Sequence, residues 1–189
     1  MVRLTDVPDS TPIGRGGFRP RRGDNVPVKR LLILRHAKSD WGNSSLDDWE
    51  RPLSERGIND APRVGEMLRA RSSIPDLIIT SDAIRARSTA EAAAEAAGYA
   101  GEILLEPSLY LATPAAIVEV LNSTADDSAG AVMIVGHNPG LEGLVAHLSG
   151  EHQPMPTAAL VQLSLPIERW RDLDLSLGAS IVDTWRPRD

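Results

Sequence analysis

The sequence predicts a single α/β domain of three layers, with a mostly parallel central sheet and helices on both of its faces. From Arg30 onward, short apolar runs alternate with helical patterns, and this alternation is typical of strand–helix units. Two of the apolar runs end abruptly in a histidine, at His36 and at His137. A chain of 189 residues can bury a sizeable core in one domain, and we see neither an internal repeat nor a second domain.

The first half of the predicted domain contains three strands and two helices. We expect strands over residues 31–34, 76–80 and 102–105. An alanine-rich helix over 83–97 follows the second strand, and Gly98 is placed to end it. Another helix lies within 54–71, where Pro62 leaves two alternatives. Either the helix is kinked at the proline, or it starts near Asp60 with the proline in its first turn.

The second half contains three more strands and two more helices. A buried-type strand is expected over 131–135, and two late strands are expected over 158–165 and 179–183. Thr113-Pro114 should start a helix, because threonine caps a helix well and proline is favoured in the first turn. Asn138-Pro139 starts the other helix in the same way, with Gly150 at its end.

Residues 1–29 differ from the rest of the chain. They contain four Gly, four Pro, six basic and three acidic residues, which leaves this segment at +3 and residues 30–189 at −9. Such a composition predicts a disordered N-terminal extension before a folded domain over 30–189. A start of translation at Val28 is an alternative that the sequence leaves open.

Charge and composition exclude several classes of function. A net charge of −6 and a pI near 5.2 argue against nucleic acid or an anionic membrane as the main partner. No apolar stretch approaches the roughly 18 residues that cross a bilayer, and no secretory signal is evident. The absence of cysteine excludes a thiol nucleophile and a cysteine metal site. We therefore expect a cytoplasmic protein, and nothing demands more than a monomer.

The two strand-end histidines predict a site for an anionic group. Ligands of open α/β sheets bind at the carboxyl ends of the strands, so His36 and His137 meet over one site if their strands are neighbours. Arg35 beside His36 offers a planar fork that matches phosphate oxygens, and a neutral imidazole is a competent nucleophile. His137 directly precedes a helix start, where backbone N–H groups attract anions. A phosphate is the simplest ligand for this set.

Two further segments supply candidate cations. Arg85 and Arg87 follow the second strand but lie two positions apart, so they cannot share one helix face. At most one of them should point into the site, with the other in solvent. The charged segment 48–57 includes Arg51, and taken alone it would be a solvated surface.

Together these segments resemble the histidine phosphatase superfamily, which has the phosphoglycerate mutase-like fold. Within it, the chain is most similar to the small bacterial SixA-like phosphohistidine phosphatases. The matching segments occur in the expected order and span the predicted domain: 34–41, 51–53 with 56–57, 81–89, 135–142 and 156–159. A single Arg-His pair would be weak, whereas several ordered segments at strand ends form a specific pattern.

The resemblance implies a role for each core residue. His36 corresponds to the nucleophile that is transiently phosphorylated. Arg35 and Arg85 correspond to the arginines that bind the phosphate. His137 corresponds to the second histidine, which binds the phosphoryl group and stabilises the transition state. Neither a metal nor an organic cofactor belongs to this mechanism.

The resemblance also extends to residues around this core. Arg51 matches an additional arginine of the SixA-like branch, and we expect it to reach the same phosphate, together with Asn138. The larger members of the superfamily use a carboxylic acid to protonate an alkoxide leaving group. Glu106 is near that position but lacks the surrounding motif, and Asp48 or Glu50 are alternatives. A missing acid favours good leaving groups, so we expect phosphohistidine on a protein, or a phosphorylated small molecule, as substrate.

Three competing functions remain at this stage. A phosphomutase of the same fold is disfavoured by the short chain and the poor acid motif. A phosphate-binding module without turnover is disfavoured by the intact set of arginines and histidines. A metal enzyme that uses His36 and His137 as ligands is disfavoured because no short metal-ligand spacing is present.

Overall fold

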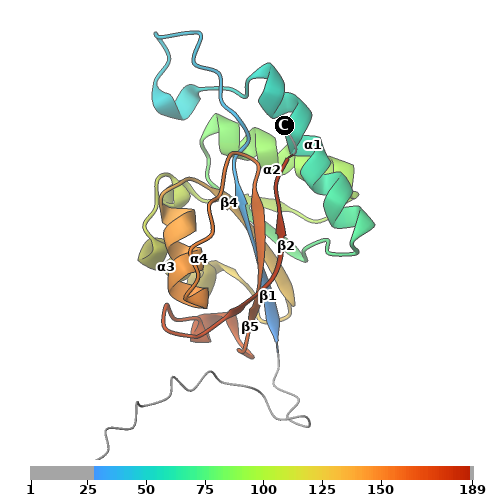
Figure 1. The fold of residues 1–189 in the computed structure, drawn as a ribbon, viewed down its shortest axis with the longest axis vertical. Coiled ribbons are helices and arrows are strands. Elements are labelled where there is room, and N and C mark those ends of the chain that lie inside the picture. The colour runs from blue at the N-terminus through green and yellow to red at the C-terminus, as the bar shows by residue number, and fades with distance from the viewer. Residues whose placement is uncertain (1–27, 188–189) are drawn as a thin grey trace, which may run out of the picture.

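The computed structural model describes residues 28–187, so most of the predicted extension over 1–29 lies outside the described residues. Six strands form one sheet in the order β3-β2-β4-β1-β5-β6 (Figure 1). β3, β2, β4 and β1 are parallel to one another, whereas β5 pairs antiparallel with β1, and the edge strand β6 pairs antiparallel with β5. The strands are β1 (Lys29–Arg35), β2 (Leu77–Thr80), β3 (Ile103–Leu105), β4 (Ala131–Gly136), β5 (Leu160–Leu165) and β6 (Ser180–Trp185).

Two pairs of helices cover the two faces of the sheet, which confirms the predicted three-layer α/β fold. α1 (Glu55–Ala70) and α2 (Ile84–Ala97) pack on one face, and α3 (Pro114–Thr124) and α4 (Gly140–Ser149) pack on the other (Figure 1). Short 3-10 helices are η1 (Asp48–Glu50), η2 (Pro107–Leu109) and η3 (Trp170–Asp172). Within residues 28–187, no helix has both the length and the hydropathy needed to cross a membrane.

The central strand β1 is buried on both faces, which explains its uninterrupted apolar run. Leu31 and Ile33 pack in the core under α3 and α4, whereas Leu32 and Leu34 pack in the core under α1 and α2. All four side chains are fully buried. Successive side chains of a strand point to opposite faces, so a strand between two helical layers must be apolar at every position.

Helix α1 runs through Pro62, and the alternative start near Asp60 is wrong. Ser54 caps the helix because its hydroxyl accepts a hydrogen bond from Gly57 N at 3.2 Å. The small residue at Gly65 lets α1 approach α2 closely, since a Cβ there would collide with the carbonyl oxygen of Ala93. This packing stabilises a helix that contains a proline and would otherwise be a poor one.

Two predicted element boundaries shift for local reasons. β1 begins at Lys29, one residue before the expected domain boundary, and the Lys29 ammonium donates to the carbonyl oxygen of Ala129 at 3.0 Å. β5 begins at Leu160 instead of residue 158, because Ala158 has a left-handed φ of 59° that no strand residue adopts. Ala158 N donates instead to the carbonyl of His36 at 3.1 Å, so this turn lies against the end of β1.

Candidate active site

The structure brings the two strand-end histidines together. β1 and β4 are neighbouring parallel strands with Arg35 opposite Gly136, and His36 N donates to the carbonyl oxygen of Gly136 at 3.1 Å. The imidazole rings of His36 and His137 lie 5.0 Å apart, centroid to centroid. Both side chains are buried. The carboxyl edge of the sheet therefore holds a histidine pair, as expected for a ligand site of an open α/β fold.

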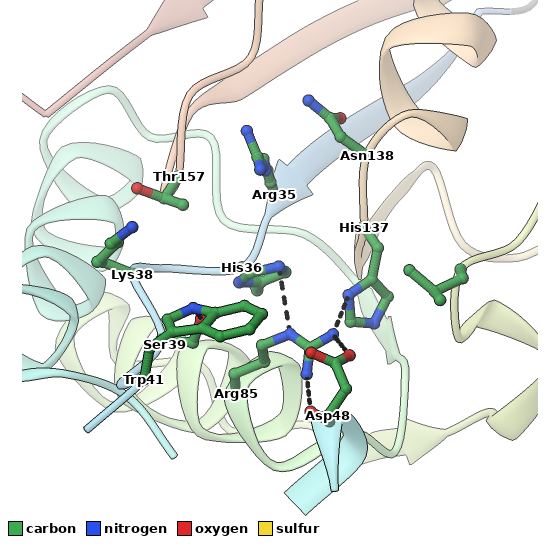
Figure 2. Close-up of a pocket in the computed structure, with 11 residues that line it drawn as sticks. Arg35, His36, Lys38, Ser39, Trp41, Asp48, Arg85, His137, Asn138 and Thr157 are labelled. Carbon is green, nitrogen blue, oxygen red and sulfur yellow. Dashed lines mark hydrogen bonds and ion pairs between the residues drawn. The ribbon is translucent and has the colours of Figure 1, made fainter. Parts of the chain in front are cut away.

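A cavity of about 280 Å³ opens over this pair (Figure 2). Its lining combines cations, imidazoles and a few apolar side chains, and it consists of Arg35, His36, Lys38, Ser39, Trp41, Asp48, Arg85, Leu111, His137, Asn138 and Thr157. Among the described residues, no three His, Asp or Glu side chains are grouped as in a metal site. The cavity thus presents an anion-binding surface made of arginines, histidines and a helix start.

His36 is held as a neutral ring with a defined tautomer. Its Nδ1 lies 2.8 Å from the carbonyl oxygen of Ala37, and a carbonyl only accepts, so Nδ1 carries the proton. Burial lowers the pKa of His36 to about 4, an effect that the bond to Ala37 opposes and the charge of Arg85 reinforces. At neutral pH, Nε2 therefore keeps a lone pair, which accepts a hydrogen bond from Arg85 Nε at 3.4 Å.

His137 is neutral for similar reasons. Burial lowers its pKa to about 3, and the adjacent His36 and Arg85 add to the effect. Arg85 Nη2 donates to Nδ1 at 3.4 Å, so the ring proton lies on Nε2, which is 3.0 Å from the hydroxyl of Ser81. Ser81 reaches His137 because it follows β2, and β2 and β4 are neighbouring strands.

These two pKa values predict that the free energy of unfolding decreases as the pH is lowered below about 6.5. In the unfolded chain, both histidines titrate near 6.5, whereas in the folded protein they titrate near 4 and 3. Below pH 6.5 the unfolded chain binds protons that the folded protein refuses, so the free energy of unfolding should drop by up to about 1.4 kcal/mol per pH unit for each ring.

Urea unfolding between pH 7.5 and 5.5 measures this dependence, because most carboxylates titrate below that range. The variant His36→Asn should lose about half of the slope, since it removes one of the two buried rings. An unfolding free energy that stays constant over this range would show that the folded protein protonates both histidines as readily as the unfolded chain does.

Arg85 is the cation at the centre of the site. Its side chain is only 5% exposed, and its guanidinium lies between the two imidazoles and Asp48 (Figure 2). Arg87 points away, where it is 54% exposed and paired with Glu91 at 2.7 Å. Only one of the two arginines thus reaches the cavity, as the two-residue spacing on the helix requires.

Asp48 is the carboxylate of the cavity. Its Oδ2 accepts from Arg85 Nη2 at 2.8 Å and from the Tyr110 hydroxyl at 2.7 Å. Burial by itself raises the pKa of Asp48, but the hydrogen bond from Tyr110 and the charge of Arg85 outweigh it and hold the pKa below its usual value. Tyr110 had no recognisable signal in the sequence, because it comes from a loop 62 residues away from Asp48.

Arg35 and Asn138 line the cavity from the side of α4. Arg35 Nη1 donates to the carbonyl oxygen of Met155 at 2.8 Å. Its Nε is buried and has no hydrogen-bond partner among residues 28–187, which leaves one N–H without an acceptor. Asn138 Nδ2 donates to Glu142 Oε1 at 2.8 Å and to the Met155 carbonyl at 3.1 Å. Both side chains are therefore fixed by the same loop.

Neither Arg51 nor Glu106 is part of the cavity lining, although Arg51 Nε lies 3.8 Å from Asp48 Oδ1. The Arg51 guanidinium donates to the carbonyls of Asn43 and Leu46 and lies 4.2 Å from the centroid of the Trp41 ring, so it braces the 41–48 loop. Glu106 accepts from Ser108 N at 3.1 Å as the cap of η2. Glu106 follows β3, which is separated from β1 by the two strands β2 and β4.

A histidine pair, two inward arginines and a helix start on an α/β sheet form a site whose charges and donors suit a phosphoryl group. In agreement, residues 31–110 match the model of the histidine phosphatase superfamily (branch 1). The chain is 31% identical to an uncharacterised protein of Mycobacterium tuberculosis over 161 residues, which are 78% of this chain and 96% of that protein. The chain belongs to the histidine phosphatase superfamily.

Other relatives and solved structures agree with this placement. An uncharacterised chloroplast protein of Arabidopsis thaliana is 34% identical over 71% of this chain and 66% of its own length, so the aligned part falls just short of two thirds of that protein. The structure of a SixA protein from Agrobacterium tumefaciens superposes with a TM-score of 0.72 at 26% identity, covering 84% of this chain and 98% of that one. A SixA protein in complex with tungstate shares the fold, with a TM-score of 0.69 at 20% identity over 82% and 95% of the two chains.

A phosphoglycerate mutase of Clavibacter michiganensis is 40% identical over 72 residues, which cover 37% of this chain and 29% of the mutase. Family membership and these neighbours therefore support a phosphatase or phosphomutase activity.

Proposed function

We propose that the protein is a phosphatase that transfers a phosphoryl group to Nε2 of His36 and then to water, without a metal ion. Its substrate would be phosphohistidine or a related phosphoramidate or phosphomonoester. The observation that carries the proposal is the state of His36: a neutral ring whose proton is held on Nδ1 by the Ala37 carbonyl. This leaves the Nε2 lone pair beside the guanidinium of Arg85, where a phosphoryl group would be bound.

In the first step, Nε2 of His36 attacks phosphorus while the bond from phosphorus to the leaving atom breaks. Arg85 and Arg35 neutralise the charge on the phosphoryl oxygens, which is the main catalytic demand of a loose transition state. The negative charge of the phosphoryl group raises the pKa of His137 and favours its doubly protonated ring. Nδ1–H of that ring can then donate to a phosphoryl oxygen.

In the second step, water attacks the phosphorylated His36. The bond from phosphorus to Nε2 breaks, its electron pair returns to the ring, and inorganic phosphate leaves.

Nitrogen leaving groups fit the first step at this site because a phosphoramidate nitrogen takes up a proton easily from water. An alkoxide needs a protonated acid, whereas the contacts of Asp48 hold its pKa low and keep the carboxylate ionised.

The test is hydrolysis of a phosphohistidine peptide, with phosphoramidate as a small substrate, in the presence and absence of EDTA. Turnover that resists EDTA would support the proposed chemistry. Loss of activity with EDTA and its recovery with a divalent metal would contradict it. Transfer of the phosphoryl group to a second acceptor instead of water would identify a phosphomutase, and tight phosphate binding without turnover would identify a phosphate-binding module.

Asp48 competes with the substrate for Arg85 in this mechanism. Its carboxylate occupies Arg85 Nη2, and a phosphoryl oxygen would need the same N–H group. The variant Asp48→Asn removes the competing charge but keeps an oxygen that can accept from Tyr110. Inorganic phosphate should therefore bind about two- to fivefold more tightly to the variant, the range of a partly exposed ion pair. The inhibition constant of phosphate measures this effect.

The control is Glu50→Gln, an exposed carboxylate of the same segment. It should leave phosphate inhibition unchanged. If Asp48→Asn instead removed hydrolysis of phosphomonoesters with poor leaving groups, Asp48 would be a proton donor, contrary to the mechanism proposed here.

A further inference from the structure

One wall of the cavity is an exposed tryptophan that the mechanism above does not use. Trp41 is 62% exposed, although it lines the same cavity as His36 and Arg85. Figure 2 shows its ring beside Ser39, close to the side chains that surround the reacting centre. An exposed tryptophan is common on protein surfaces, but such a side chain is seldom fixed in orientation.

The orientation of Trp41 is fixed from two sides. On one face of the ring, the Arg51 guanidinium lies 4.2 Å from the ring centroid, a cation–π contact. Arg51 is itself nine-tenths buried and bonded to the Asn43 and Leu46 carbonyls, so it cannot leave the ring easily. At the ring edge, Nε1 donates to the Ser39 hydroxyl at 3.1 Å. The buried Ser39 pairs with Leu53 in a β-bridge.

A second exposed apolar residue lines the same cavity. Leu111 lines the cavity, is 55% exposed and adopts a left-handed φ of 48°. A leucine rarely adopts this backbone conformation, and such strained positions gather at ligand sites. A cavity of about 280 Å³ has room for a phosphoryl group and little beyond one ring. The cavity thus combines a polar end at the arginines and histidines with two exposed apolar side chains, Trp41 and Leu111.

We propose that the free face of Trp41 stacks against a flat, unsaturated leaving group, such as the imidazole of phosphohistidine, and so selects that class of substrate. The effect of Trp41 on the choice of substrate rests on the proposed function, whereas the binding of a flat ring to Trp41 does not. Arg51 acts as a positioning residue that holds Trp41. The resemblance implied that Arg51 binds the phosphate, whereas in the structure its guanidinium lies against the Trp41 ring.

Non-hydrolysable phosphonates test the binding independently of turnover. Phenylphosphonate carries a flat ring on phosphorus, cyclohexylphosphonate a saturated ring of the same carbon count, and methylphosphonate no ring. The protein should bind phenylphosphonate about three- to tenfold more tightly than either of the others, the range expected for one aromatic contact. In Trp41→Ala this advantage should disappear while methylphosphonate affinity stays the same, and in Trp41→Phe most of it should remain.

Trp49→Ala is the matched control, because Trp49 is an exposed tryptophan of the same loop and lies outside the cavity lining. It should bind all three phosphonates as the parent protein does. Equal affinity for the three ligands, or a preference for the flat ring that survives in Trp41→Ala, would overturn the proposal. So would an equal loss for all three ligands in Trp41→Ala, since that result would mean that Trp41 only orders the loop.

Kinetics then separate this inference from the proposed function. In Trp41→Ala, kcat/KM should fall about three- to tenfold for phosphoimidazole and stay unchanged for phosphoramidate, whose leaving group has no ring. The same relative loss is expected for phosphohistidine as the free amino acid and within a peptide, and the one that the parent protein hydrolyses faster indicates the natural source. A parent protein that binds the flat ring selectively but hydrolyses nothing would contradict the proposed phosphatase and retain the role of Trp41.

Discussion

Replacement of His36 by alanine is expected to abolish hydrolysis, with kcat/KM reduced by about 10⁴-fold or more, because the variant has no nucleophile to accept the phosphoryl group. In the parent protein, rapid mixing with a ³²P-labelled phosphoramidate and acid-free quenching should trap a phosphorylated enzyme that is stable in alkali and labile in acid, as a phosphorylated imidazole is. The variant should show no label. The fold should survive, because alanine only removes atoms at the cavity floor.

His147→Ala is the control for this experiment. His147 is exposed on α4 and does not line the cavity, so its loss should leave both turnover and labelling intact. If His36→Ala retained turnover, or if the label appeared in that variant, the phosphoryl group would be carried by another residue or passed directly to water.

Replacement of Arg85 by alanine is expected to lower kcat/KM by about 10³-fold or more. Arginines that stabilise the charge of a transferring phosphoryl group have effects of this size. Arg85 is buried, and its guanidinium contacts both imidazoles and the carboxylate of Asp48. The inhibition constant of tungstate or inorganic phosphate should rise in parallel, because the same guanidinium binds the ground-state anion.

The matched controls are Arg87→Ala and Arg85→Lys. Arg87 lies on the same helix but is exposed and paired with Glu91, so its removal should change kcat/KM by less than about twofold. Lysine at position 85 keeps the charge but loses the planar fork, and we expect it to recover only a small part of the activity. A normal kcat/KM in Arg85→Ala would place the phosphoryl group elsewhere in the cavity.

Residues at strand ends are the part of the site that local sequence could indicate. Arg35 with His36 and His137 with Asn138 follow apolar runs directly, and the carboxyl ends of neighbouring parallel strands meet at one edge of a sheet. Arg85 over Arg87 followed only from the resemblance; helix geometry required just that one of the two face away. Each of these residues is placed by the short segment of chain around it, so the local sequence pattern was enough to predict its position.

Residues that reach the site from loops could not be placed in this way. Asp48 was only an alternative to Glu106 as the acid, because both are near a matching segment and sequence gives no distance between them and the histidines. In the structure, Tyr110 and Arg85 hold Asp48 in the cavity, while Glu106 caps η2. Similarly, Arg51 matched a phosphate ligand by sequence, but its Nη1 and Nη2 donate to loop carbonyls.

The sequence by itself determined the α/β class, the parallel strand–helix order and the histidine pair at the strand ends, because burial imposes a regular pattern of apolar residues on such elements. Only the tertiary structure decided the tautomer and protonation of His36, the contact of Asp48 with Arg85 and the wall formed by Trp41. Each of these depends on burial or on a hydrogen bond between residues that meet through the fold or at a loop turn. Such contacts have no period and no fixed spacing, so they become visible only when the chain is folded.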